Sequence, residues 1–157
     1  MALNEEQSRI LDEAAKQFAD LSTIREMKGI SDEEMEAIYS MGVNFYKAGS
    51  YENAEKIFRF LVLFDHSNAR YWTGFGSLMQ AQRKFDEAIK AYQYAMFLDL
   101  ENPRAIYYCA ECNLAKGDKE LCLELLKTLE EHCPKTTDLG RKFLVKGAKL
   151  KALAEAK

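Results

Sequence analysis

Apolar and small side chains return along this chain at a fixed interval of 34 residues. Within each block the apolar residues lie three or four positions apart, which is the spacing of one face of an α-helix. A second apolar set follows each first set after a short polar interval, so the pattern predicts three helical hairpins and an all-α fold. The repeated positions are Ile38, Met41, Gly42 and Phe45, then Trp72, Phe75, Gly76 and Met79, then Ile106, Cys109 and Ala110.

Small residues recur where two helices of a hairpin are expected to cross. Twelve residues after Gly42, Gly76 and Ala110 come Ala54, Ala88 and Cys122. A bulky side chain at either level would push the helices apart. Between the helices, Gly49 and Gly117 mark tight turns in which a positive φ is easiest without a Cβ. Arg83 takes this position in the second block, so we expect a strained or altered turn there.

The period and the small residues together are typical of a tetratricopeptide array. The chain is expected to be a single all-helical domain, with repeats at 35–68, 69–102 and 103–136. An N-terminal arm at 1–30 would precede them, and a C-terminal capping helix at 137–157 would follow. Stacked hairpins form a short superhelix with a concave groove, and function is expected in that groove rather than in a catalytic pocket.

The N-terminal arm carries an apolar helical stripe that belongs to no repeat. Such a stripe must be buried on the end of the array or on another molecule, and we expect dimerisation through it. Gly29 marks a hinge after the arm, and Ser31 with Glu34 forms a capping box that begins the first repeat. The residues assigned to the dimer contact are Ile10, Leu11, Ala14, Phe18 and Leu21.

The C-terminal segment predicts one more amphipathic helix. Thr136, Thr137 and Asp138 offer capping side chains after Pro134. Its apolar side is expected to be Leu139, Phe143, Leu144, Leu150 and Leu153, and its solvated side Arg141, Lys142, Lys146, Lys149 and Lys151.

Composition and charge exclude several classes of protein. The 157 residues have a net charge of −3, which gives no reason to expect nucleic acid as a partner. Residues 1–36 contain ten acidic and four basic side chains, whereas residues 135–157 contain seven basic and two acidic ones. No apolar run is long enough for membrane insertion, and the N-terminus lacks the order of a signal peptide, so we expect a cytoplasmic protein.

The four cysteines are the main candidates for chemistry. Cys109 and Cys112 have a metal-like spacing and, with Cys122 and Cys133, would nominally supply four thiolates for zinc. Cys109 and Cys122 also fall on packing positions of the repeat, which favours free structural thiols. We therefore expect no metal, no cofactor and no enzyme activity, with a thiol or zinc protein as the alternative.

Some residues on the helix faces are not required for packing of the repeats, and these residues indicate which kind of ligand binds. In tetratricopeptide arrays the first helix of each repeat lines the concave face. Its tyrosines suit peptide capture, and the groove lacks the dense cationic clamp that holds a C-terminal carboxylate, so we expect an internal extended segment. The candidate groove residues are Tyr39, Val43, Tyr46, Lys47, Arg70, Thr73, Ser77, Gln80, Arg104, Tyr107, Glu111 and Leu114.

Several short runs go beyond the general repeat. They are Ile38-Tyr39-Ser40-Met41, Gly49-Ser50-Tyr51-Glu52-Asn53-Ala54, Phe58-Arg59-Phe60-Leu61, Asp65-His66, Ala88-Ile89, Pro103-Arg104 and Ala110-Glu111-Cys112. Over about residues 28–135 the chain resembles the class II chaperones of bacterial type III secretion translocators. Val43 and Asn113 depart from that pattern, which puts ligand preference in question more than the fold.

The resemblance implies a chaperone that holds hydrophobic pore-forming translocators soluble in the bacterial cytoplasm. It would capture an extended N-terminal segment of its cargo in the concave groove. The resemblance also implies a homodimer through the N-terminal arm and a role in virulence. Some members of the family assist a transcription activator after their cargo has been secreted. The alternative is a generic tetratricopeptide adaptor for protein–protein interaction.

Overall fold

The computed structural model describes residue 9 and residues 23–156, and every element with bounds within 23–156 is a helix. The predicted dimer contact at Ile10, Leu11, Ala14, Phe18 and Leu21 lies outside the described residues. The helices are α2 (Ile24–Lys28), α3 (Asp32–Lys47), α4 (Tyr51–Phe64), α5 (Ala69–Ala81), α6 (Phe85–Leu98), α7 (Pro103–Lys116), α8 (Lys119–His132) and α9 (Asp138–Ala156).

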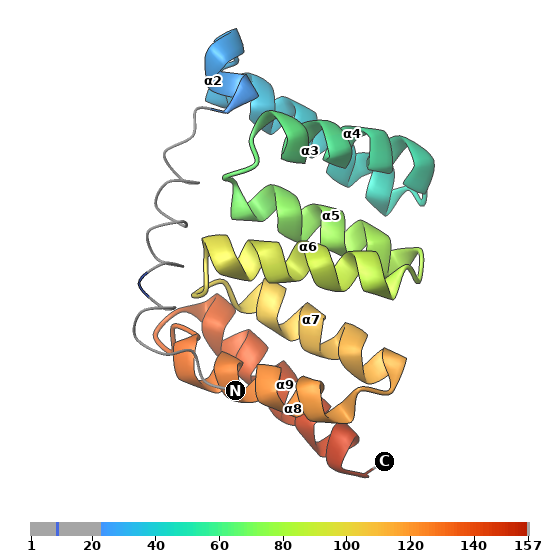
Figure 1. Ribbon diagram of the computed structural model, residues 1–157, viewed down its shortest axis with the longest axis vertical. Coiled ribbons are helices and arrows are strands. Elements are labelled where there is room, and N and C mark those ends of the chain that lie inside the picture. Colours follow the sequence, from blue (N-terminus) through green and yellow to red (C-terminus); the bar gives the residue numbers. More distant parts are fainter. Residues whose placement is uncertain (1–8, 10–22, 157) are drawn as a thin grey trace.

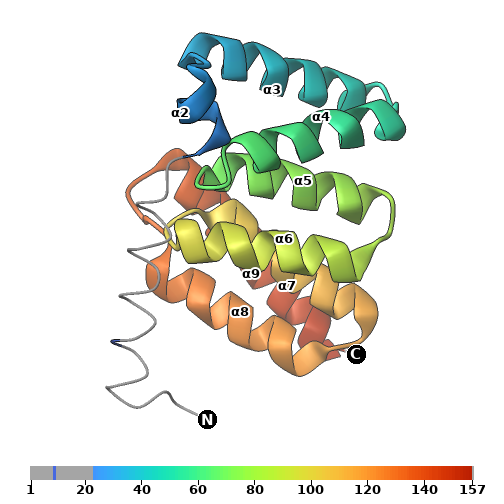
Figure 2. The same ribbon diagram turned by 45° about the horizontal axis from the view of Figure 1, so that its top comes forward.

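Three helical hairpins follow one another along the longest axis of the molecule (Figure 1). They are α3 with α4, α5 with α6, and α7 with α8, and each second helix also contacts the first helix of the next hairpin. The helix α9 packs against α7 and α8 at the end of the stack, and Figure 2 shows the same order after a turn of the molecule. The first helices α3, α5 and α7 touch in succession, which places one face of each on a common side. The prediction of an all-α array is confirmed.

Close packing explains the small residues of the period. A Cβ added at Gly42 would lie 2.8 Å from Cγ2 of Ile57, and one added at Gly76 would lie 2.7 Å from the ring of Tyr92. Real Cβ contacts are never so short, and Tyr92 is fully buried and has no room to move. The glycines therefore set the distance between the two helices of a hairpin.

The turns inside the hairpins share one backbone conformation. Gly49, Arg83 and Gly117 all have a positive φ, of 73°, 60° and 90°. Among residues with described conformations, Arg83 is the one that adopts it with a side chain. Of the strained or altered turn expected in the second hairpin, the structure has the strained form: the backbone keeps the positive φ of the other two turns, and an L-residue is disfavoured in this region.

Local capping fixes where the helices begin. Ser31 and Glu34 form the predicted capping box at the start of α3, with hydrogen bonds of 3.2 and 2.9 Å. Asn102 accepts a hydrogen bond from the Arg104 backbone N–H at 3.1 Å, and Pro103 stands at the first position of α7, where no N–H is needed. At α9, the Thr137 hydroxyl accepts from the Gly140 N–H at 3.0 Å, as the sequence predicts.

The C-terminal helix differs from the sequence expectation at two positions. Lys146 was expected on the solvated side, but its ammonium lies 4.8 Å from the ring centroid of Tyr107, 5.4 Å from that of Tyr108 and 5.1 Å from that of Phe143. Leu153 was expected on the apolar side but is 50% exposed. Both expectations are wrong because the buried face of α9 runs through Phe143, Gly147, Leu150 and Ala154, which leaves Leu153 outside it and brings Lys146 over the rings of α7.

Candidate functional site

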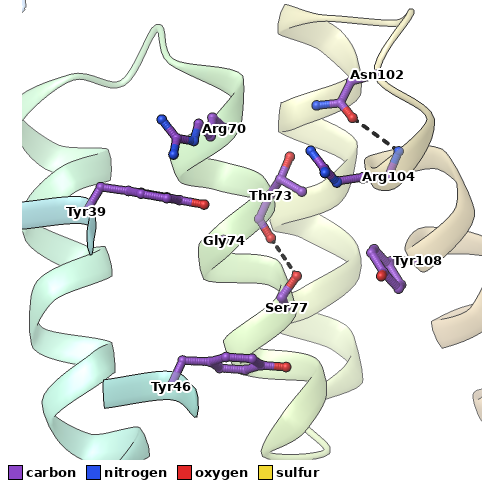
Figure 3. Close-up of a pocket in the computed structure, with 9 residues that line it drawn as sticks. All are labelled: Tyr39, Tyr46, Arg70, Thr73, Gly74, Ser77, Asn102, Arg104 and Tyr108. Atoms are coloured by element: carbon purple, nitrogen blue, oxygen red, sulfur yellow. Dashed lines mark hydrogen bonds between the residues drawn. The ribbon is translucent and has the colours of Figure 1, made fainter. Parts of the chain in front are cut away.

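A cavity of about 390 Å³ opens on the side that α3, α5 and α7 share (Figure 3). The lining combines aromatic rings, short hydroxyl side chains and two arginines, and it comes from all three hairpins. The lining residues are Tyr39, Tyr46, Arg70, Thr73, Gly74, Ser77, Asn102, Arg104 and Tyr108.

One wall of the cavity is an aromatic and cationic stack. The Tyr39 ring lies 5.9 Å from the buried ring of Phe58 and 5.7 Å from that of Tyr71, which holds it in place. The Arg70 guanidinium covers its other side at 4.0 Å. Glu36 accepts two hydrogen bonds from this guanidinium, at 2.6 and 3.1 Å, so the arginine is anchored across two hairpins. The carboxylate raises the pKa of Arg70, and the arginine lowers the pKa of Glu36.

Tyr46 lies at the opposite end of the cavity from Arg70 (Figure 3). Its ring is half-buried and lies 6.0 Å from the ring of Tyr51, and burial raises the pKa of its hydroxyl. The ring therefore stays neutral and offers an apolar surface with a single polar tip.

The floor of the cavity comes from one side of α5. Thr73 donates to the Ala69 carbonyl at 2.8 Å, and Ser77 donates to the Thr73 carbonyl at 3.0 Å. These bonds fold the hydroxyls back onto the helix and keep the side chains short. Gly74 lies between them, and a Cβ there would be 2.5 Å from the Phe58 ring. The absence of that side chain lets Phe58 pack beneath Tyr39, and no side chain fills the cavity from this position.

Tyr108 forms the wall contributed by the third hairpin. Its ring lies 6.0 Å from that of Tyr92 and 5.8 Å from that of Phe143. Phe143 belongs to α9, so the C-terminal helix helps to set the ring that faces the cavity. Burial raises the pKa of Tyr108, and the neighbouring Arg104 charge opposes that rise.

A chain of polar side chains connects the second and third hairpins beside the cavity. Tyr92 donates to Gln80 at 2.8 Å, and Gln80 donates from its amide to Glu111 at 2.7 Å. Tyr107 donates to the other Glu111 oxygen at 3.2 Å, and burial raises the pKa of Tyr107 to about 12. These polar groups satisfy one another and act as a structural link.

The structure brings together half of the groove residues named from the sequence. Tyr39, Tyr46, Arg70, Thr73, Ser77 and Arg104 line the cavity. Gln80, Tyr107 and Glu111 form the polar link instead, and Tyr107 is 7% exposed. Val43 and Leu114 pack against the core, and Lys47 is exposed.

Three lining residues escaped the sequence reasoning: Gly74, Asn102 and Tyr108. Gly74 and Tyr108 are 34 residues apart and so occupy the same repeat position, which was a usable signal. Asn102 ends the loop before α7, where a cap residue is easily taken as purely structural.

The four cysteines lie in the core. All four are free and buried, and burial raises the pKa of each thiol, that of Cys109 to about 11 and that of Cys112 to about 12. Such thiols stay protonated and are poor nucleophiles. Within residues 23–156 no group of three or more His, Cys, Asp or Glu side chains is arranged to hold a metal ion.

The opposite side of the second hairpin has a smaller hollow of about 300 Å³. Trp72 and Tyr94 pack there with ring centroids 4.5 Å apart, and the Arg59 guanidinium lies 5.2 Å from the centroid of the Phe75 ring.

In the described part of the chain, no helix has both the length and the apolar character needed to cross a membrane.

Comparison with known proteins gives one family model and several relatives. The tetratricopeptide repeat model matches residues 71–102. Low calcium response locus protein H of Yersinia pestis is 38% identical over 96 residues, which are 61% of this chain and 57% of that protein. The chain thus spans little more than half the length of this relative.

Solved structures match over most of the chain. A T3SS complex from Aeromonas hydrophila gives a TM-score of 0.81 at 28% identity, covering 92% of this chain and 94% of that one. The type III secretion translocator chaperone SycD of Yersinia enterocolitica gives 0.75 at 31% identity, covering 87% and 99%. SycD in complex with a peptide of the translocator YopD gives 0.75 at 29% identity, covering 81% and 96%.

Proposed function

This chain belongs to the type III secretion translocator chaperones, and on that premise we propose that its concave cavity binds an extended segment of a hydrophobic translocator. Bound there, the segment is removed from aggregation and from premature contact with its partners, so the cargo stays soluble in the bacterial cytoplasm. Binding alone performs this task, and it requires neither a cofactor nor a chemical step.

The observation that carries the proposal is the cavity formed jointly by α3, α5 and α7. Its walls are rigid tyrosines with little entropy to lose, and its floor has short side chains that leave room for a backbone. An extended peptide that is already close to a polyproline conformation also loses little entropy on docking. The SycD structure with a YopD peptide supports peptide capture by this fold.

The test is co-expression with a candidate apolar translocator of a type III secretion system, followed by pull-down. We expect soluble cargo with the wild type and insoluble cargo with Tyr39→Ala/Tyr46→Ala, because two walls of the cavity are then lost. Tyr94→Ala is the matched control, since it removes a half-buried tyrosine from the opposite side. Circular dichroism checks that each variant remains helical. Full recovery of soluble cargo by the double variant would contradict binding of the cargo in this cavity.

A second candidate is a generic adaptor that binds folded partners. The aromatic hollow around Trp72 and Tyr94 favours it, because exposed aromatic clusters often mark protein interfaces. Loss of cargo with Tyr94→Ala and retention with Tyr39→Ala/Tyr46→Ala would support the adaptor.

We also propose a homodimer through the N-terminal stripe at Ile10, Leu11, Ala14, Phe18 and Leu21. A solved structure of SycD shows an alternative dimer, so association of subunits has a precedent in the family. The variant Leu11→Asp/Phe18→Asp should halve the mass measured by light scattering. An unchanged mass would contradict the role of the stripe.

A further inference from the structure

The main cavity carries an uneven charge. Two of its nine lining residues are arginines and none is Asp or Glu, although the whole chain has a net charge of −3. We propose that the bound segment presents a side-chain carboxylate to Arg104, followed or preceded by an apolar side chain at Tyr46. This inference rests on the proposed function and names the chemistry of the segment that the cavity selects.

The two arginines differ in what already neutralises them. Arg70 donates two hydrogen bonds to Glu36 and stacks on Tyr39, so its charge is largely neutralised within the protein. Arg104 is exposed, and among the described residues its guanidinium takes part in no ion pair. The backbone N–H of Arg104 is fixed by Asn102 at 3.1 Å, so the base of the side chain is anchored while its end remains available. A guanidinium fork matches a carboxylate with two parallel hydrogen bonds.

The arrangement of the lining separates the two contacts of the segment. In Figure 3, Arg70, Asn102 and Arg104 lie toward one end of the cavity, and Tyr46 lies at the other. Tyr46 is half-buried and stays neutral, which suits an apolar neighbour. One extended segment can therefore place an acidic residue beside Arg104 and an apolar residue beside Tyr46.

A second cavity offers room for the segment to continue beyond Arg104. This hollow of about 370 Å³ shares Asn102 and Arg104 with the first and extends over Pro134 and Leu139. Chain can therefore pass Arg104 on both sides, so the carboxylate belongs to an internal Asp or Glu rather than to a C-terminus. Asp99 and Glu101 line this second hollow, so a further acidic residue of the segment is disfavoured there.

The experiment uses short overlapping peptides from the N-terminal parts of candidate hydrophobic translocators of a type III secretion system, each acetylated and amidated at its ends. Affinities for the full chain are measured by fluorescence anisotropy. Each binding peptide is then resynthesised with every Asp→Asn or Glu→Gln change. We expect one such change to weaken binding to the wild type by about tenfold, as expected for a charged hydrogen-bonded pair.

Three protein variants test whether Arg104 is the partner of the peptide carboxylate whose removal weakens binding. With Arg104→Gln the acidic and amide peptides should bind equally, and Arg104→Lys should restore part of the difference. Lys149→Gln, which removes an exposed charge outside the cavity, should leave it unchanged. Binding without any carboxylate dependence, or a dependence that survives in Arg104→Gln, would overturn this inference alone. Failure of every peptide to bind would overturn the proposed groove function together with it.

Discussion

The Arg70 guanidinium lies 4.0 Å from the centroid of the Tyr39 ring, although the two residues belong to different hairpins. Glu36 completes the group by accepting two hydrogen bonds from the same arginine. The arginine in this wall of the cavity is therefore already paired with a carboxylate of the protein. Arg104 is left as the cavity arginine whose charge is available to a ligand.

Glu36→Gln is expected to strengthen binding of acidic segments. Without the carboxylate, Arg70 gains an unneutralised charge, and its pKa falls toward the ordinary value because its main anionic partner is gone. Peptide affinity should rise by about twofold to fivefold at low salt, and added salt should cancel the gain. Anisotropy with one acidic peptide and its amide version measures the effect. Glu33→Gln, at an exposed position of the same helix, serves as the control.

Gly76→Ala is expected to destabilise the second hairpin. The new Cβ would lie 2.7 Å from the Tyr92 ring, which is fully buried and hydrogen-bonded to Gln80 at 2.8 Å. Overpacking of this kind costs about 1–3 kcal/mol, offset by at most about 1 kcal/mol from the better helix propensity of alanine. Urea unfolding measures the difference. Ser40→Ala, on an exposed part of α3, should be close to neutral, and equal stability of both variants would contradict the packing argument.

Lys146→Gln is expected to loosen α9 and to weaken cargo binding together. Its ammonium faces the rings of Tyr107, Tyr108 and Phe143, and a half-buried cation–π contact contributes about 1 kcal/mol. Because Tyr108 also lines the cavity, the same change should reduce peptide affinity by a few fold. Thermal unfolding and anisotropy measure the two effects. Lys149→Gln should change neither, and a loss of stability without any change of affinity would separate α9 from the cavity.

Stability should fall as the pH rises above about 9. Burial raises the pKa of Cys109 from 9.0 to about 11 and that of Cys112 to about 12, so the folded chain keeps protons that the unfolded chain loses. The contribution is complete below pH 9 and decreases above it by about 1.4 kcal/mol per pH unit for each thiol. Urea unfolding at a series of alkaline pH values shows the slope.

The variant Cys109→Ala/Cys112→Ala tests the origin of that slope. It should be less stable than the wild type at neutral pH, because two fully buried side chains are reduced in size. Its stability should nevertheless decline less steeply between about pH 9 and about pH 10. An identical slope in both proteins would assign the alkaline loss to other groups.

The hairpins were predictable because their determinants are local. Ser31 and Glu34 cap α3 within one turn, and Gly49 and Gly117 adopt the positive φ that their positions require. The strained turn at Arg83 was also predictable, since the period places a non-glycine where the other repeats have glycine. Short-range spacing and backbone sterics are sufficient for these features.

The sequence by itself thus determined the number of repeats, their turns and the general location of a groove. The tertiary structure decided which neighbouring tyrosine faces that groove. Tyr107 and Tyr108 are adjacent on one helix, and Phe143 and Lys146 of α9 contact both rings, with Tyr107 buried and Tyr108 in the cavity wall. The charge of the groove likewise depends on Glu36 reaching Arg70 from 34 residues away. Such contacts form only when separate hairpins pack, and no local pattern contains them.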